Sequence, residues 1–227
     1  MKAIILDNIL FEPNLGYLYE HLHVPPSPAQ RQIFDVLAAQ AAEVARPRAL
    51  YGLSAINELG DDFIVVEKIR FDSRVLAVNV KSVHRVFPFV VTCGAELVQW
   101  ADGISDMLKR FYADALKQAA LDTATRFLEK EIQKHFDMGH ISQMSPGSLS
   151  DWPLEQQRPL FDLLGDTQST VGVKLTSSMV MLPDKSESGF YFQSESEFTS
   201  CQLCPIKKCS SRKVPFVENF YEEKYQK

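Results

Sequence analysis

The chain has 227 residues, of which 45% are hydrophobic and 23% are charged, an ordinary globular composition that argues against long disordered stretches. Its formal net charge of −5 gives no electrostatic reason to expect binding to nucleic acid. No apolar run reaches the roughly 18 residues of a membrane span, and the first apolar run ends at Asp7, too early for a secretory signal. We therefore expect a cytoplasmic protein, in which clustered thiols are metal ligands rather than disulfides.

The first third of the chain predicts three strands and one helix. Residues 2–12 are expected to form a first strand, and two short strands are expected at residues 50–56 and 63–67. Between them, Ser27 is a helix cap followed by a proline at the first helical position, and Pro47 ends the helix. A regular apolar stripe along this helix predicts that it packs on a core.

The middle third alternates between a short helix, a buried strand and a long helix. Ser73 is predicted to cap the short helix. Residues 83–92 are expected to form a mostly buried strand, in which Pro88 indicates an edge position or a bulge. The helix expected from Ser105 to His135 is about 45 Å long at 1.5 Å per residue.

The last part of the chain predicts a loop, a helix and a hairpin. Residues 143–148 have neither helical nor strand periodicity and are expected to form a loop, and a helix is expected from Pro153 to Gly165. Residues 172–193 alternate on either side of a Pro-Asp turn, which predicts two strands of one hairpin. Strands at both ends with helices between them predict one α+β domain over residues 1–212, followed by a charged C-terminal tail over residues 213–227.

Three of the four cysteines lie within nine residues, with the spacing C-x2-C-x4-C. Iron–sulfur clusters and zinc both require thiolates brought together by short spacings of this kind. Cys201, Cys204 and Cys209 supply three ligands, and Cys93 is the remaining candidate for a fourth. Cys93 lies between a strand and the start of a helix, where backbone N–H groups favour a thiolate. An iron–sulfur cluster, a zinc ion and a set of free thiols all remain open from the sequence.

A set of motifs between Ser145 and Phe192 resembles the reactivation domain of cobalamin-dependent methionine synthase, above all its stand-alone relatives. The motifs are, in order, S-P-G, D-W-P-L-x-x-Q, G-V-x-L-T-x-S and P-x-x-S-x-S-G-x-Y-F. The resemblance implies a twisted antiparallel sheet with flanking helices, one of them long. It also implies binding of S-adenosylmethionine and docking on a cobalamin domain, where one electron and a methyl group restore methylcobalamin.

The residues that match the ligand motif of this family are only partly those of the family pattern R-x-x-x-G-Y. Gln143 stands in place of the arginine, Gly147 matches, and Ser148 replaces the tyrosine. Tyr191 matches the tyrosine of the family's Y-F strand. Arginine can pair with a carboxylate through two charged hydrogen bonds, and neutral glutamine cannot. Losing such a bond costs on the order of 1.5–3 kcal/mol, so the resemblance implies a kept scaffold with a weakened grip on the ligand.

Two functions follow as hypotheses. The first is an accessory protein that supports reductive remethylation of a cobalamin-dependent methyltransferase, with a cysteine-bound cluster relaying an electron from a donor. The cobalamin would be carried by the partner, a corrinoid protein or methionine synthase core, and the methyl transfer would occur on the partner's cobalt. The alternative is a metal-binding electron-transfer or assembly subunit, with iron–sulfur or zinc, that has lost S-adenosylmethionine.

Overall fold

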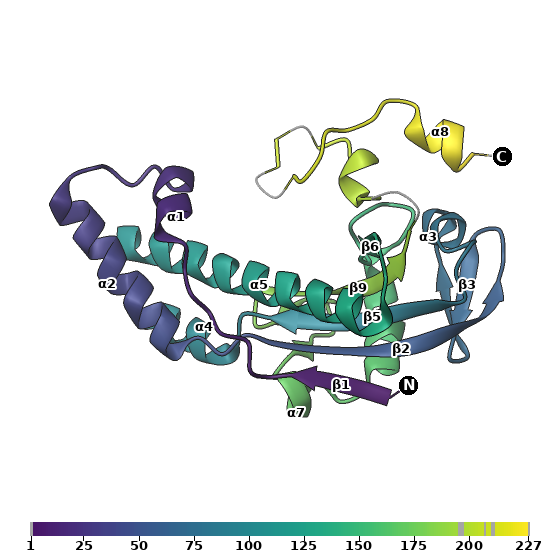
Figure 1. Ribbon diagram of the computed structural model, residues 1–227, viewed down its shortest axis with the longest axis horizontal. Coiled ribbons are helices and arrows are strands. Elements are labelled where there is room, and N and C mark those ends of the chain that lie inside the picture. Colours follow the sequence, from purple (N-terminus) through teal and green to yellow (C-terminus); the bar gives the residue numbers. More distant parts are fainter. Residues whose placement is uncertain (1, 195–197, 207, 210–211, 227) are drawn as a thin grey trace.

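A central antiparallel sheet carries the fold of the protein, whose computed structural model describes residues 2–194, 198–206, 208–209 and 212–226 (Figure 1). Within these residues the sheet has seven strands, in the order β4-β3-β2-β5-β9-β6, with β1 also paired to β2. A separate two-stranded ribbon consists of β7 and β8. The strands are β1 (Lys2–Leu6), β2 (Arg48–Leu59), β3 (Phe63–Val66), β4 (Ile69–Asp72), β5 (Arg85–Thr92), β6 (Ile141–Met144), β7 (Lys174–Leu175), β8 (Met181–Leu182) and β9 (Ser186–Gln193).

Helices cover both faces of this sheet. One face is covered by α2, α4 and α5, and the other by α3, α6 and α7. The helices are α1 (Leu15–His21), α2 (Pro28–Val44), α3 (Arg74–Asn79), α4 (Ala95–Asp102), α5 (Met107–Phe136), α6 (Gln157–Leu164), α7 (Thr167–Val171) and α8 (Phe220–Lys224), with short 3₁₀ turns η1 (Leu154–Gln156) and η2 (Ser200–Gln202). This arrangement confirms the predicted α+β class, and α5 confirms the long helix.

Alternating side chains of the central strands divide the interior into two cores. Phe87, Phe89 and Tyr191 pack toward α2, α4 and α5. Val90 and Phe190 point to the opposite face, toward α3, α6 and α7. Because β5 is buried on both faces, its sequence is almost continuously apolar, as expected of such a strand.

The prediction that Pro88 marks an edge or a bulge is wrong, because β5 lies between β2 and β9. The β2–β5 ladder pairs Tyr51 with Phe89 and Ser54 with Val86 in one unbroken register. It skips the two positions between these pairs, where Pro88 has no N–H to donate. On the β9 side the pairing continues through Pro88. The proline is therefore accommodated by a missing rung and not by a change of register.

The helix boundaries follow the predicted capping residues. Ser27 Oγ accepts a hydrogen bond from the backbone N–H of Gln30 at 3.4 Å, and Ser73 Oγ accepts one from Leu76 at 3.0 Å. The long helix begins after Asp106, whose carboxylate caps it. Gly165 ends α6 with a φ of 82°, a conformation that glycine adopts at little cost. Local side-chain chemistry therefore sets these ends.

Two predictions about the second half of the chain are wrong. Residues 172–193 do not form one hairpin, because β7 and β8 pair with each other while β9 pairs with β5 and β6. The expected loop over residues 143–148 begins inside β6, the edge strand beside β9. The first strand also ends at Leu6, earlier than expected. The S-P-G motif therefore follows directly after β6, a strand of the main sheet.

The C-terminal segment packs back onto the second core (Figure 1). Tyr225 is fully buried, and its hydroxyl donates to Asn79 Oδ1 at 3.0 Å. Arg74 donates to the Tyr225 carbonyl oxygen. These contacts fix the position of residues that the charge pattern alone presents as a tail. The division of the chain at residue 212 stays a prediction.

Candidate functional site

Gln143 lies on the edge strand β6, directly opposite Tyr191 in the β6–β9 ladder. Its side-chain amide Nε2 donates to Glu187 Oε1 at 2.5 Å and to Ser145 Oγ at 3.3 Å. The structure thus brings together two of the four residues predicted to bind the ligand, Gln143 and Tyr191. It adds Glu187 and Ser145, which are not among the residues predicted to bind the ligand.

Tyr191 is buried beneath α5 and has only 1% of its surface exposed. Its ring lies against Phe89, with centroids 4.4 Å apart, and its hydroxyl donates to Glu129 Oε1 at 3.4 Å. Burial raises the pKa of Tyr191 well above its ordinary value, and the nearby carboxylates of Glu129 and Glu187 raise it further. The hydroxyl is therefore a protonated donor held on Glu129, and the ring is a packing element of the first core.

Glu187 is a carboxyl group at this site whose pKa is shifted. Burial raises the pKa of its carboxyl, and the carboxylates of Glu129 and Asp122 raise it further. The hydrogen bond from Gln143 and the charge of Lys213 lower the pKa without offsetting the rise. The sequence does contain a signal for Glu187, because residues 187, 189 and 191 alternate onto one face of β9.

The S-P-G loop follows β6 and contacts the thiol segment, which is the stretch of chain that carries Cys201, Cys204 and Cys209. Gly147 has a φ of 82°, and its N–H donates to the Trp152 carbonyl at 2.7 Å. The positive φ favours glycine here, and a Cβ at this position would also lie 2.8 Å from Leu154 Cδ1. Ser148 Oγ donates to the Ser145 carbonyl at 2.6 Å and contacts Ser200 Oγ at 3.2 Å. Both residues thus lie on the loop that follows Gln143, and Ser148 contacts the segment that carries the thiols.

The thiol segment is organised by one arginine. The Arg212 guanidinium donates to four backbone carbonyls, those of Cys201, Cys204, Ile206 and Val214. The N–H of Lys213 also donates to Cys201 Sγ at 3.5 Å. Across the described residues, no three His, Cys, Asp or Glu side chains are arranged to hold a metal ion. The hydrogen bonds fix the path of the segment, and the thiols do not converge.

Cys93 does not join the other thiols. It is fully buried between β5 and α4, and its thiol donates to the Gly94 carbonyl at 3.6 Å. Burial raises its pKa to about 12, so the expectation of a favoured thiolate is wrong. Thr92, the residue before Cys93, pairs with Ser186, five residues along β9 from Tyr191, so Thr92 lies about 17 Å from the Gln143–Tyr191 pair at roughly 3.4 Å per residue and Cys93 lies beyond it.

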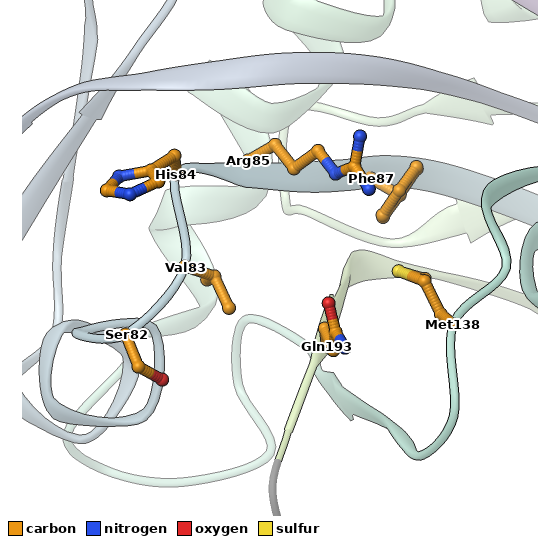
Figure 2. A pocket seen from close by; sticks show the side chains of 7 residues that line it. All are labelled: Ser82, Val83, His84, Arg85, Phe87, Met138 and Gln193. Atoms are coloured by element: carbon orange, nitrogen blue, oxygen red, sulfur yellow. The ribbon is translucent and has the colours of Figure 1, made fainter.

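A cavity of about 330 Å³ lies on the face of the sheet that α5 covers, next to the paired residues Phe87 and Tyr191. Its floor includes Phe87, the cross-strand partner of Tyr191, and its rim includes Gln193 and Arg85. Figure 2 shows Phe87, Met138 and Gln193 pointing toward one another. None of the four predicted ligand residues lines this cavity.

A second cavity, of about 490 Å³, opens beside α4 and the turn before β9. Lys117 lines it and is nearly buried, with its Nζ 2.9 Å from Asp184 and 3.3 Å from Asp114. Asp114 also contacts Lys185 at 3.1 Å. Asp114 therefore takes part in an ion-pair network that links α5 to the turn before β9. This network gives the Asp114 carboxylate a structural role.

The solved structures that are similar to this chain in fold include a domain of methionine synthase. The chain aligns with the crystal structure of the MetH reactivation domain bound to AdoHcy, with a TM-score of 0.62 and 15% sequence identity, over 88% of this chain and 81% of that one. The alignment supports the activation-domain-like architecture predicted from the motifs. No family model and no curated protein matches the sequence. Among the described residues, no helix is both long enough and apolar enough to cross a membrane.

Proposed function

We propose that this chain is a cytoplasmic accessory protein that supports reductive remethylation of a cobalamin-dependent methyltransferase, with methionine synthase or another corrinoid protein as its partner. The observation that carries the proposal is the shared fold with a MetH reactivation domain over most of the chain. The motif residues add support, because Gln143 and Tyr191 lie side by side on β6 and β9.

The chain's own residues would bind and orient the methyl donor, and the transfer itself would occur at the partner's cobalt. S-adenosylmethionine, when bound, supplies a methyl group on a positively charged sulfur. Gln143, Gly147 and Ser148 lie on β6 and the loop after it, where they can contact such a ligand. Tyr191 holds β9 in place beside Gln143, because its ring is buried in the core and its hydroxyl is hydrogen-bonded to Glu129. This assignment uses no nucleophile from the chain.

The thiol segment fits a metal centre only in part. It offers three cysteines on one loop, but the described residues form no metal-binding group of three, and Cys93 is remote. We therefore derive no electron-transfer step through a cluster. An iron–sulfur cluster or a zinc ion remains part of the proposal as a prediction about Cys201, Cys204 and Cys209. Metal analysis and visible absorption of anaerobically purified protein, compared with Cys204→Ser, measure it directly.

The alternative, a metal-binding subunit without S-adenosylmethionine, is favoured by one observation. The Gln143 amide that stands in place of the family's arginine is already bonded to Glu187 and is not free to pair with a carboxylate. A reactivation assay separates the two functions. It follows transfer of a labelled methyl group from S-adenosylmethionine to the cobalamin of a methionine synthase that lacks its own activation domain, with a chemical reductant present.

The expected result is labelled methylcobalamin only when the chain is present. Gly147→Ala should reduce the transfer, because its Cβ would meet Leu154 in a turn with positive φ. Gly139→Ala is the matched control, since a Cβ there meets nothing within 4 Å. Absence of labelled cobalamin with folded protein, or equal transfer by the two variants, would contradict the proposal.

A further inference from the structure

The hydrogen bonds of Gln143 determine what this side chain can offer to a ligand. A glutamine amide has two N–H donors and one carbonyl acceptor. The donors of Gln143 are engaged by Glu187 Oε1 at 2.5 Å and by Ser145 Oγ at 3.3 Å. What remains for a ligand is the amide oxygen, an acceptor. In the family pattern the arginine at this position has five donors and no acceptor.

Glu187 extends the same acceptor surface. The position is variable in the motif P-x-x-S-x-S-G-x-Y-F, and here it holds a carboxylate. Glu187 is partly exposed, and within the described residues no lysine, arginine or histidine lies within ion-pair distance of it. Its surroundings carry both signs: Glu129 and Asp122 on α5 are negative, and Lys213 on the C-terminal segment is positive.

These contacts carry one inference, which rests on the proposed function for the location of the ligand. We propose that Gln143 and Glu187 reverse the polarity of the ligand site, so that it recognises a positively charged group of an S-adenosyl ligand and not its carboxylate. The amide oxygen and the carboxylate together form a site for a cation or a strong hydrogen-bond donor. The ligand class is therefore an adenosyl sulfonium or amine, for which a carboxylate is dispensable.

The electrostatics of Glu187 agree with this polarity. A partly desolvated carboxylate beside two further carboxylates gains more from a cation than a solvated one does. The pKa of Glu187 is raised in the absence of a ligand. A bound cation favours the ionised form, so binding should release a proton and should weaken as the pH falls toward the pKa of Glu187.

The test is calorimetric titration of the full chain with three ligands at about pH 8. S-adenosylmethionine carries a sulfonium, an ammonium and a carboxylate, its decarboxylated form lacks only the carboxylate, and 5′-methylthioadenosine is neutral. We expect the first two to bind within about threefold of each other and the neutral ligand to bind about tenfold or more weakly, the scale of a charged hydrogen bond. Glu187→Gln should remove most of that difference, and Glu58→Gln, an exposed carboxylate on β2, should preserve it.

Gln143→Arg supplies a second arm, because the new guanidinium would pair with Glu187 and offer donors again. It should weaken the decarboxylated ligand relative to S-adenosylmethionine by about tenfold. The inference is overturned if the decarboxylated ligand binds at least tenfold more weakly to the parent chain, if the neutral ligand binds equally well, or if no ligand binds. In each case the reactivation assay still decides the proposed function, because it measures methyl transfer and not charge preference. Thermal melts confirm that each variant is folded.

Discussion

Replacing Arg212 tests whether one side chain holds the thiol segment in place. Its guanidinium reaches four carbonyl oxygens, two of them belonging to Cys201 and Cys204, at 3.0 and 2.9 Å. No neutral residue can replace these contacts. Lysine can replace only some of them, because its ammonium is a compact charge without the planar fork of arginine. Arg212→Ala should therefore open the segment locally and leave the sheet intact.

The expected magnitude follows from the number and exposure of these hydrogen bonds. A hydrogen bond to a charged group contributes about 1.5–3 kcal/mol when buried, but Arg212 is partly exposed and water replaces some of what is lost. A net loss of about 2–3 kcal/mol for the segment raises its local opening about thirty- to a hundred-and-fifty-fold. Cys201 is partly exposed already, so its alkylation rate should rise by less, about tenfold.

Alkylation followed by peptide mass spectrometry measures this rate for each thiol. Cys209 is exposed and serves as an internal reference whose rate should not change. Lys208→Ala, which removes an exposed cation of the same segment, is the matched control. Arg212→Lys should lie between the parent and Arg212→Ala. Equal alkylation of Cys201 in the parent and in Arg212→Ala would refute the view that the guanidinium organises the segment.

Three further predictions concern stability. Lys117→Met leaves Asp184 without its 2.9 Å partner and should cost about 1–2 kcal/mol, because the carboxylates are half exposed; thermal unfolding should fall by roughly 2–8 °C. The raised pKa of Glu187 means that the folded state holds this proton more tightly than the unfolded chain, so its contribution is lost as pH rises through that pKa. Glu187→Gln should therefore stabilise the protein at about pH 8 and not at about pH 3.5, as urea titrations at both pH values can show. Gly189→Ala places a Cβ 2.2 Å from the Met144 carbonyl and should cost about 1–3 kcal/mol in urea titration, with β6 displaced.

Features that depend on neighbours in the sequence could be predicted. The caps at Ser27 and Ser73 act within three residues of themselves, so the residue order alone sets where α2 and α3 begin. The long helix and the end of α6 at Gly165 follow in the same way from periodicity and from the conformational freedom of glycine. The general α+β class follows from the order of such elements.

Features that depend on strand pairing could not be predicted. Pro88 indicates an edge when read locally, yet β5 is central because β9, a strand about a hundred residues later, covers its other side. The same pairing makes a strand of Gln143 and Met144, whose sequence has no strand periodicity. Cys93 shows the limit for chemistry, because a helix start favours a thiolate, but complete burial outweighs that effect.

The candidate ligand site depends both on residue identities that the sequence shows and on strand pairing that only the structure shows. The absence of the family's arginine is visible in the sequence as Gln143, and read alone it indicates a weakened grip on the ligand. The register of β6 against β9 adds what the sequence conceals, because it lets the Gln143 amide reach Glu187, 44 residues later. In the ligand site that we propose, a glutamine beside a carboxylate presents acceptors where an arginine would present donors, and a site of opposite sign selects a different part of the same ligand. If this proposal holds, affinity for a charged sulfonium or amine, and not affinity for a carboxylate, is the measurement that tests ligand binding by this chain.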